Sequence, residues 1–377
     1  MLKQIVAFRR ELHHFPELSG HEQQTAKKIK EWIQTANPDQ IIENVGGYGL
    51  MVIFRGKSKG KSILLRADMD ALPIHEANEF EHRSSSPGIS HKCGHDGHSA
   101  ILAGVARWLG SNPPEKGSVI LLFQPAEETG KGASLVLADP GFAELEIDFA
   151  FAIHNLPGFP KNSIVIRDHY FAAASRGMIV RLTGITSHAA HPEHGISPAL
   201  ALADIIRKFG GISVENDGFQ DFKLITIVHA RLGERAFGTS PGYAEVMATL
   251  RTYSDQDMKT LVSKAIKAVV LIADKFGLDE RVEWTEEFPA TINDEKCVGL
   301  IRDVATENNL KIIRAEEPFR WSEDFGHFLS KYPGALFGVG AGKRHPVLHH
   351  PDYDFPDEII PTGISVFTGL IQKISMI

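Results

Sequence analysis

The 377-residue sequence predicts an α/β fold with a central, mostly parallel sheet, into which a second, ferredoxin-like domain is inserted. Short, uninterrupted apolar segments alternate with stretches of helical spacing, which is typical of a sheet covered by helices. In the middle of the chain the expected order becomes β-α-β-β-α-β, the ferredoxin-like order. Because the α/β pattern then resumes, we expect a discontinuous larger domain of residues 1–176 and 290–377 and an inserted domain of residues 177–289.

The larger domain is predicted from four apolar and two helical segments. Each apolar segment is bounded by polar residues, glycine or proline, as buried strands are. The strands are expected at residues 62–68, 118–124, 149–155 and 334–340. "TAKKIKEWI" (25–33) and "HSAILAGVARWL" (98–109) repeat apolar residues at intervals of three and four, which predicts helices.

The inserted domain is predicted from four strand patterns and two helical ones. The strands are expected at residues 178–184, 222–232, 243–253 and 281–288, with a turn joining the middle two. The helices are expected at residues 197–209 and 257–277, with Ser197 as the cap and Pro198 at the first position of one and Gly277 closing the other. "GITSHAAHPEHG" (184–195), in which glycines flank histidines, suits a mobile loop.

The composition excludes several classes of protein. An apolar fraction of 43% and a charged fraction of 23% are those of a globular chain. The net charge of −7 argues against a nucleic acid or an anionic membrane as partner. No apolar run reaches the roughly 18 residues of a membrane span. With only two cysteines and no signal-peptide pattern at the N-terminus, the cytoplasm is the expected location.

Polar residues with metal-binding side chains cluster at the ends of the predicted strands. In open α/β sheets, ligands bind at the carboxyl ends of the strands. The residues in question are Asp68 and Asp70, Glu127 and Glu128, His154, and the loop "HKCGHDGH" (91–98) that precedes a helix. Four separate segments therefore bring carboxylate, imidazole and thiolate groups to one edge of the sheet.

This mixture favours a catalytic over a structural metal site. A structural zinc site usually needs four cysteine or histidine ligands, and here Cys93 and Cys297 are far apart in the chain. One thiolate with several imidazoles and carboxylates can instead hold two divalent ions with open positions. Taken singly, each residue also has a simpler interpretation: a solvated Glu127–Glu128 pair, a core histidine, turn-capping aspartates, or a small buried Cys93. The remaining histidines at positions 13, 14, 75, 82, 91, 327 and 345 are expected to be solvated or structural.

With these residues assembled, the chain resembles the M20 metallopeptidase family. It is most similar to the amidohydrolase branch, which contains hippurate hydrolases, aminoacylases, N-acetyl-diaminopimelate deacetylases and plant auxin-conjugate hydrolases. The motifs that carry the resemblance, in order, are "RRELHHFPELSGHE" (9–22), "LLRADMDALPI" (64–74), "HKCGHDGHSAILAG" (91–104), "FQPAEETGKGA" (123–133), "AIHN" (152–155), "SHAAHP" (187–192), "SEDFGHF" (322–328) and "LHHPDYDFPDE" (348–358).

The resemblance implies roles for individual residues. It implies two divalent ions, zinc or manganese first and cobalt or nickel also compatible, whose ligands are Cys93, His95, Glu128, His154 and His349. It implies that Glu127 is the general base and that Asp70 orients a metal ligand. It also implies a homodimer, or a higher homo-oligomer, in which His188 of the inserted lid reaches the active site of the partner subunit.

The same resemblance implies a reaction, in which a metal-activated water hydrolyses the amide bond of an N-acyl amino acid or a similar conjugate. A dipeptidase or carboxypeptidase on the same scaffold is the alternative, and a catalytically silent scaffold protein is the alternative outside enzymes. One departure concerns the substrate. In "RAFGTSPGYAEVMATLR" (235–251), Gly238 stands where the family has a substrate-binding asparagine, and Ala248 replaces a glycine.

Overall fold

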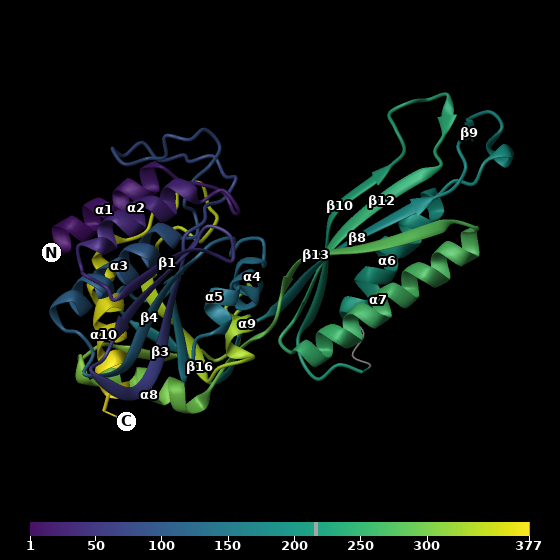
Figure 1. Ribbon diagram of the computed structural model, residues 1–377. Helices are drawn as coiled ribbons and strands as arrows, with labels where there is room; N and C mark the ends of the chain where they lie inside the picture. Colours follow the sequence, from purple (N-terminus) through teal and green to yellow (C-terminus); the bar gives the residue numbers. More distant parts are fainter. Residues whose placement is uncertain (215–217, 377) are drawn as a thin grey trace. The chain divides into compact units, whose positions relative to one another are not determined.

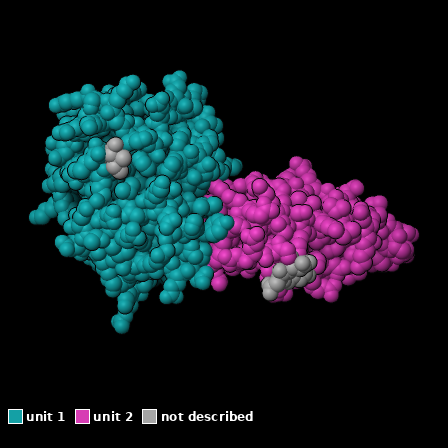
Figure 2. Space-filling model, turned by 90° about the horizontal axis from the view of Figure 1, so that it is seen from below, with its two compact units in different colours: residues 1–171, 291–318, 324–377 teal, residues 172–290, 319–323 magenta. Residues whose placement is uncertain are grey.

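The computed structural model describes residues 1–214 and 218–376, which form two compact units (Figure 2). Unit 1 comprises Met1–Phe171, Thr291–Pro318 and Asp324–Ile377, and unit 2 comprises Ala172–Ala290 and Phe319–Glu323. The sequence assigned residues 319–323 to the larger domain. They belong to unit 2 because Phe319 forms a parallel bridge with Ala172, and its carbonyl accepts the N–H of Ala173 at 2.9 Å.

Unit 1 is built on an eight-stranded mixed sheet, with the order β1-β2-β4-β3-β5-β16-β6-β15. The strands are β1 (Gln40–Val45), β2 (Gly49–Arg55), β3 (Ser58–Asp68), β4 (Lys116–Gln124), β5 (Phe149–Pro157), β6 (Ile164–Ile166), β15 (Ile312–Arg314) and β16 (Gly334–Gly342). The four central strands, β4, β3, β5 and β16, run parallel to one another. A separate two-stranded sheet joins β7 (His169–Ala172) to β14 (Thr291–Asn293).

Helices cover this sheet (Figure 1). They are α1 (Leu2–His14), α2 (Gln23–Gln34), α3 (His95–Ser111), α4 (Gly132–Ala138), α5 (Pro140–Ala143), α8 (Glu295–Glu307), α9 (Gly326–Leu329) and α10 (Ile360–Ile374), with a 3-10 turn η2 (Asp357–Ile359). The main core lies between the sheet and α1, α2, α3, α8 and α10. Residues from Ala100 to Ala106 of α3 are all buried there, because this helix packs against strands and other helices together.

Unit 2 has the predicted β-α-β-β-α-β order. Its elements are β8 (Ala174–Thr183), β9 (Ser187–His188), η1 (Pro192–His194), α6 (Ala199–Val214), β10 (Lys223–Leu232), β11 (Thr239–Ser240), β12 (Tyr243–Thr252), α7 (Asp255–Phe276) and β13 (Asp279–Phe288). The main sheet has the order β10-β12-β8-β13, and every neighbouring pair is antiparallel. Gly277 ends α7 in the left-handed conformation with φ 66°. The predicted fold class is therefore confirmed.

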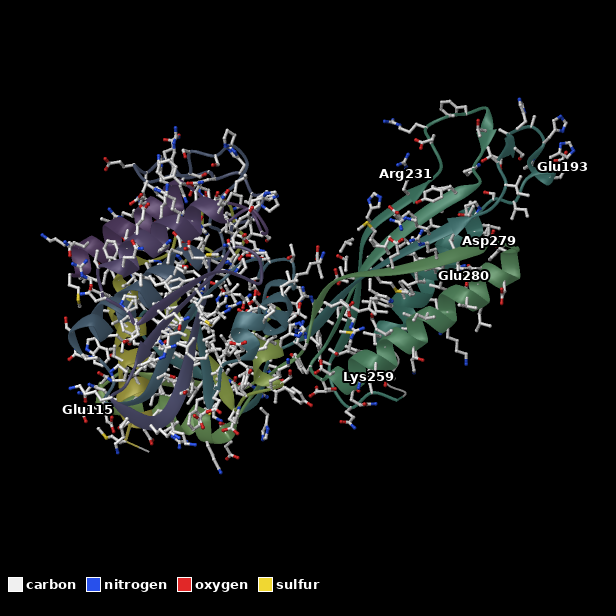
Figure 3. All side chains as sticks on the ribbon, in the orientation of Figure 1. Glu115, Glu193, Arg231, Lys259, Asp279 and Glu280 are labelled. Carbon is white, nitrogen blue, oxygen red and sulfur yellow. The ribbon has the colours of Figure 1, made fainter. Side chains whose placement is uncertain are left out.

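One local prediction in unit 2 was wrong, and a second segment has more regular structure than its sequence suggested. The connection between β10 and β12 is longer than a turn, and it contains β11. The histidine-rich segment after β8 contains β9 and η1, and β9 pairs with β11 through Thr239–His188 and Ser240–Ser187. Backbone pairing between two short segments thus gives regular structure to part of the stretch that was expected to be a mobile loop. Figure 3 labels Glu193 in this region, at the end of unit 2 opposite Lys259 of α7.

None of the described helices is both long and apolar enough to cross a membrane.

Candidate metal centre

The carboxyl ends of the central parallel strands of unit 1 carry the predicted site. Asp68 is the last residue of β3, and Glu127 and Glu128 follow the end of β4. His154 lies within β5 rather than at its end, because this strand continues to Pro157. Since β3 is paired in parallel with both β4 and β5, these positions share one edge of the sheet.

The loop that carries Cys93 approaches this edge closely because of Gly94. This residue has φ 92° and directly precedes α3, which begins at His95. A Cβ at Gly94 would lie 2.4 Å from Nδ2 of Asn155 and 2.7 Å from the hydroxyl oxygen of Tyr353. A larger residue would therefore push the thiol loop away from β5, while its φ would be strained for any L side chain.

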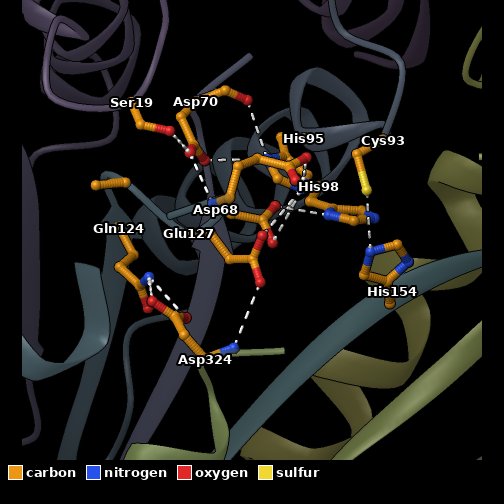
Figure 4. A network of polar contacts seen from close by, with 12 residues as sticks. Ser19, Asp68, Asp70, Cys93, His95, His98, Gln124, Glu127, His154 and Asp324 are labelled. Atoms are coloured by element: carbon orange, nitrogen blue, oxygen red, sulfur yellow. Dashed lines mark hydrogen bonds and ion pairs between the residues drawn. The ribbon is translucent and has the colours of Figure 1, made fainter. Parts of the chain in front are cut away.

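The five predicted metal ligands come together in the structure. The donor atoms of Cys93, His95 and His154 lie within 4.8 Å of one another, and so do those of Cys93, Glu128 and His349. The Cys93 Sγ to His154 Nε2 distance is 3.6 Å (Figure 4). Nε2 of His349 and Nε2 of His95 each lie 3.7 Å from Oε1 of Glu128. Two donor groups that share Cys93 are an arrangement suited to two neighbouring ions.

Unsatisfied buried atoms at this site fit bound cations. Nε2 of His95 and Oε1 of Glu128 are buried, and neither has a hydrogen-bond partner among the described residues. Leaving such an atom unpaired costs about 1–3 kcal/mol, a cost that metal coordination removes. Burial also raises the pKa of the Cys93 thiol well above its usual range, with Glu128 adding to the effect. A divalent ion reverses this by stabilising the thiolate.

Asp70 connects a histidine ligand to the glutamate segment. Its Oδ1 lies 3.1 Å from Nδ1 of His95, while its Oδ2 accepts the hydroxyl of Ser19 at 2.7 Å and the N–H of Glu128 at 3.0 Å. Burial opposes ionisation, but the contacts with His95, Ser19 and the N–H of Glu128 together hold the pKa of Asp70 below its usual value. Asp70 thereby fixes the ring of His95 so that Nε2 faces the donor cluster.

The adjacent glutamates have different surroundings. Burial raises the pKa of Glu128 to about 8, against the opposing charge of His95, and a cation at the donor cluster would restore its negative charge. Glu127 is 5% exposed, and its Oε2 lies 3.9 Å from Nε2 of His95. Its Oε1 accepts the backbone N–H of Asp324 at 3.4 Å.

A buried network of polar residues around Asn155, which the sequence did not predict, holds the metal ligands in place. The side-chain Nδ2 of Asn155 donates to the backbone carbonyl of Cys93 at 2.7 Å. The backbone carbonyl of Asn155 lies 2.8 Å from Nδ1 of His154. The N–H of Asn155 donates to Nε2 of His98 at 3.1 Å, so the other ring nitrogen carries the hydrogen and donates to Asp68 at 2.7 Å. The backbone carbonyl of Asn155 similarly accepts the Nδ1–H of His154. The Nε2 of His154 is then unprotonated, and its lone pair is available to a metal.

Two more buried residues extend this network. Arg66 is fully buried and pairs with Asp68 at 2.6 Å and with Asp324 at 2.8 Å. The only sequence signal for these contacts was the placement of Arg66 and Asp68 in one buried strand and of Asp324 in the "SEDFGHF" motif.

Two of the histidines to which no role was given are also buried. His13 is 0% exposed and contacts Asp96 and Glu76, and His91 is 1% exposed. They are therefore structural rather than solvated.

His188 is the one predicted site residue outside this cluster. It lies in unit 2, where β9 pairs with β11, and its side chain is exposed. Gly238 is beside it, since the Gly238 carbonyl accepts the N–H of Ala189 at 3.0 Å. A Cβ at Gly238 would meet no atom within 4 Å, so space for a side chain exists at the position where the family has asparagine.

Comparisons with known proteins agree with this geometry. The sequence model of peptidase family M20/M25/M40 matches residues 64–373. N-acetyl-L-cysteine deacetylase of Bacillus subtilis is 33% identical over 361 residues, covering 95% of this chain and 85% of the relative. An uncharacterized hydrolase of Staphylococcus aureus is 31% identical over 386 residues, covering 99% and 98%.

A solved structure adds the metal content of a relative. The YXEP protein of Bacillus subtilis, described as a dinuclear metal binding peptidase from the M20 family, superimposes with a TM-score of 0.83 at 26% identity, covering 98% of this chain and 97% of that one. A putative aminohydrolase from methicillin-resistant Staphylococcus aureus, at 24% identity, shares the fold with a TM-score of 0.87. The match over residues 64–373, together with relatives above 30% identity along nearly the whole chain, establishes that this protein belongs to peptidase family M20/M25/M40 and is a metal-dependent amide hydrolase.

Proposed function

We propose that the protein is an amidohydrolase that cleaves the amide bond of N-acyl amino acids or similar conjugates. The observation that carries the proposal is the convergence of Cys93, His95, Glu128, His154 and His349 into donor groups that suit two divalent ions. The most similar named relative given above is a deacetylase of an N-acetyl amino acid, which supports this substrate class over free peptides.

We assign separate steps of the hydrolysis to the bound ions, to Glu127 and to the residues that orient the metal ligands. The two ions, when bound, lower the pKa of a water and polarise the amide carbonyl. Glu127 is in neither of the two three-residue donor groups that share Cys93, although it also lies within reach of His95 and Glu128. We assign its carboxylate to take a proton from the attacking water and pass it to the leaving amine. Asp70 and Asn155 hold the ligand imidazoles in the tautomers that leave Nε2 free.

The lid contributes the remaining part of this proposal. We assign His188 to the active site of a partner subunit in a homodimer, where its ring would hydrogen-bond the developing oxyanion. Its exposure within unit 2 leaves the ring available for such a contact.

The donor atoms also limit which metal ions fit. A thiolate with imidazoles favours zinc or cobalt, whereas the carboxylates also accept manganese.

A hydrolysis screen tests the substrate class. The protein is loaded with zinc, manganese or cobalt and is offered N-acetyl amino acids, N-acetyl-L-cysteine among them, beside free dipeptides. We expect chelator-sensitive release of the amino acid from the N-acyl compounds. Faster cleavage of the free dipeptides would instead assign the protein to the dipeptidases or carboxypeptidases.

A substitution tests the base. Glu127→Gln should lower kcat by about 10²–10⁴-fold, because a general base is lost, while metal content stays at the wild-type level. Retention of more than about a hundredth of kcat would contradict the role. Loss of metal in this variant would mean that the two glutamates had been assigned in the wrong order.

A further inference from the structure

Ala126, directly before the proposed base, has a backbone conformation that is unfavourable for alanine. Its φ is 54°, in the left-handed region that costs an L residue roughly 1–2 kcal/mol. The turn around it is tightly packed, since the N–H of Gly132 donates to the carbonyl of Ala126 at 3.0 Å. A Cβ at Gly132 would lie 1.8 Å from the carbonyl oxygen of Pro125. Strain of this kind persists only where surrounding contacts impose it.

Glu22 supplies the contact that holds this conformation. Its side chain lies at the start of α2 and is 0% exposed. Oε1 accepts the N–H of Ala126 at 2.8 Å and the N–H of Gly20 at 2.9 Å. Oε2 is buried without a hydrogen-bond partner among the described residues. Burial raises the pKa of Glu22, so this carboxyl group is kept inside the protein at a cost in free energy.

The same N-terminal segment also fixes the backbone after Glu127, through Ser19 and Asp70. Ser19 donates its hydroxyl to Oδ2 of Asp70, and that oxygen accepts the N–H of Glu128. The backbone N–H groups before and after Glu127 are therefore both held by carboxylates that residues 19–22 provide or fix. This gives a physical role to the "PELSGHE" part of the N-terminal motif, which the metal ligands leave unexplained.

We propose that Glu22 is a positioning residue for Glu127, which fixes the left-handed turn at Ala126 and so aims the carboxylate of the base. The inference rests on the proposed function, because it takes Glu127 as the base. Glu22 lies outside the donor groups that suit the metal ions, so its removal should alter the base and leave the ions in place.

Glu22→Leu removes the acceptor, and Glu22→Gln keeps an oxygen at the same place. We expect Glu22→Leu to lower kcat by about 10–100-fold, the effect of misplacing a catalytic group by about 1 Å, with KM and metal content within about twofold of wild type. Glu22→Gln should stay within about threefold of wild-type kcat. If Glu22→Leu does not fold, Glu22→Asp, which shortens the reach but keeps the charge, should lose about tenfold in kcat.

Glu17→Leu is the matched control. Glu17 lies in the same segment, and its side-chain Oε2 accepts the N–H of Thr25 at 2.7 Å and the hydroxyl of Thr25 at 2.9 Å. Its carboxylate thus holds α2, and its backbone contact with Ala71 is kept in the variant. This control should lose thermal stability without losing kcat. An equal loss of kcat in Glu17→Leu, unchanged kcat in Glu22→Leu and Glu22→Asp, or loss of metal in the Glu22 variants would overturn the inference.

Amide hydrogen exchange of the peptide covering residues 125–131 gives a readout that needs no turnover. Exchange should be faster in Glu22→Leu, or in Glu22→Asp, than in wild type, and unchanged in Glu17→Leu. If wild-type protein hydrolyses no N-acyl amino acid, the proposed function fails by itself. The exchange experiment then decides whether Glu22 holds the turn, and unaltered exchange in the Glu22 variants would reject that role.

Discussion

Replacing His13 with glutamine should destabilise the protein in a pH-dependent way. The imidazole is fully buried, with Nδ1 2.8 Å from Oδ2 of Asp96 and Nε2 2.9 Å from Oε1 of Glu76. Burial by itself would lower the pKa of His13, but the charge of Asp96 and the hydrogen bonds to both carboxylates raise it to about 9. His13 is therefore protonated in the folded protein at neutral pH.

The magnitude follows from linkage between protonation and folding. The pKa of His13 is about 9 when folded against 6.5 ordinarily, and at about 1.4 kcal/mol per pH unit the difference is worth about 3 kcal/mol of stability. Because the folded pKa is the higher one, this stability is fully present below pH 6.5. It is lost as pH rises from 6.5 through 9, where the folded protein also releases the proton.

Urea unfolding of wild type and His13→Gln measures this difference. Metal occupancy should be equal in the two proteins, and the free energy of unfolding is determined between pH 6 and pH 10. We expect the difference to shrink by about 3 kcal/mol across this range. His14→Gln is the control, since His14 bonds the backbone carbonyl of Arg83 and, among the residues described, pairs with no carboxylate. A difference for His13→Gln that stays constant with pH would refute the reasoning.

Three further substitutions or labels test the site. Asn155→Leu should weaken metal affinity about 10–100-fold, measured by competition with a chelator, because it removes the side-chain hydrogen bond that holds the carbonyl of Cys93, while the backbone contacts of residue 155 with His98 and His154 remain; wild-type affinity would contradict this. A thiol reagent should modify Cys93 in chelator-treated protein but not in metal-loaded protein, with Cys297 removed as background, and equal reactivity would exclude thiolate ligation. Mixing His188→Ala and Glu127→Gln chains should restore part of the activity if His188 serves the partner subunit, and no recovery after verified subunit exchange would reject that assignment.

The strands that carry the site were predictable because their surroundings constrain their composition. A strand buried on both faces, such as Leu121–Phe123, tolerates almost no unpaired polar residue, so polar groups gather at its end. Arg66 is tolerated inside β3 because it pairs with Asp68 and Asp324. The parallel arrangement then places these ends together. The position of Asp68, Glu127 and Glu128 at one edge of the sheet required no knowledge of loop conformations.

The contacts that orient the ligands were not predictable from one sequence. Asn155 and Cys93 are 62 positions apart, and Glu22 and Ala126 are 104 apart. No local periodicity links such residues. The left-handed turn at Ala126 also carries no composition signal, since alanine ordinarily favours helix. The short strands β9 and β11 were missed for the same reason, because each is ordered by a distant partner rather than by its own propensity.

The buried charges around Glu127 are better explained by the need to position this residue than by a gain in the free energy of unfolding. A buried pair such as Arg66–Asp324 is weak support for a stable fold, because apolar residues of similar volume often stabilise a protein as well. Here the pair anchors a segment whose N–H, at Asp324, donates to Glu127. Three separate parts of the chain therefore constrain one carboxylate: the N-terminal segment through Ala126, the residues after β3 through Asp70, and residue 324 directly. Constraints from independent segments limit motion in different directions, which no single hydrogen bond achieves. A base held this way does not have to be oriented when substrate arrives, and this favours catalysis by preorganisation.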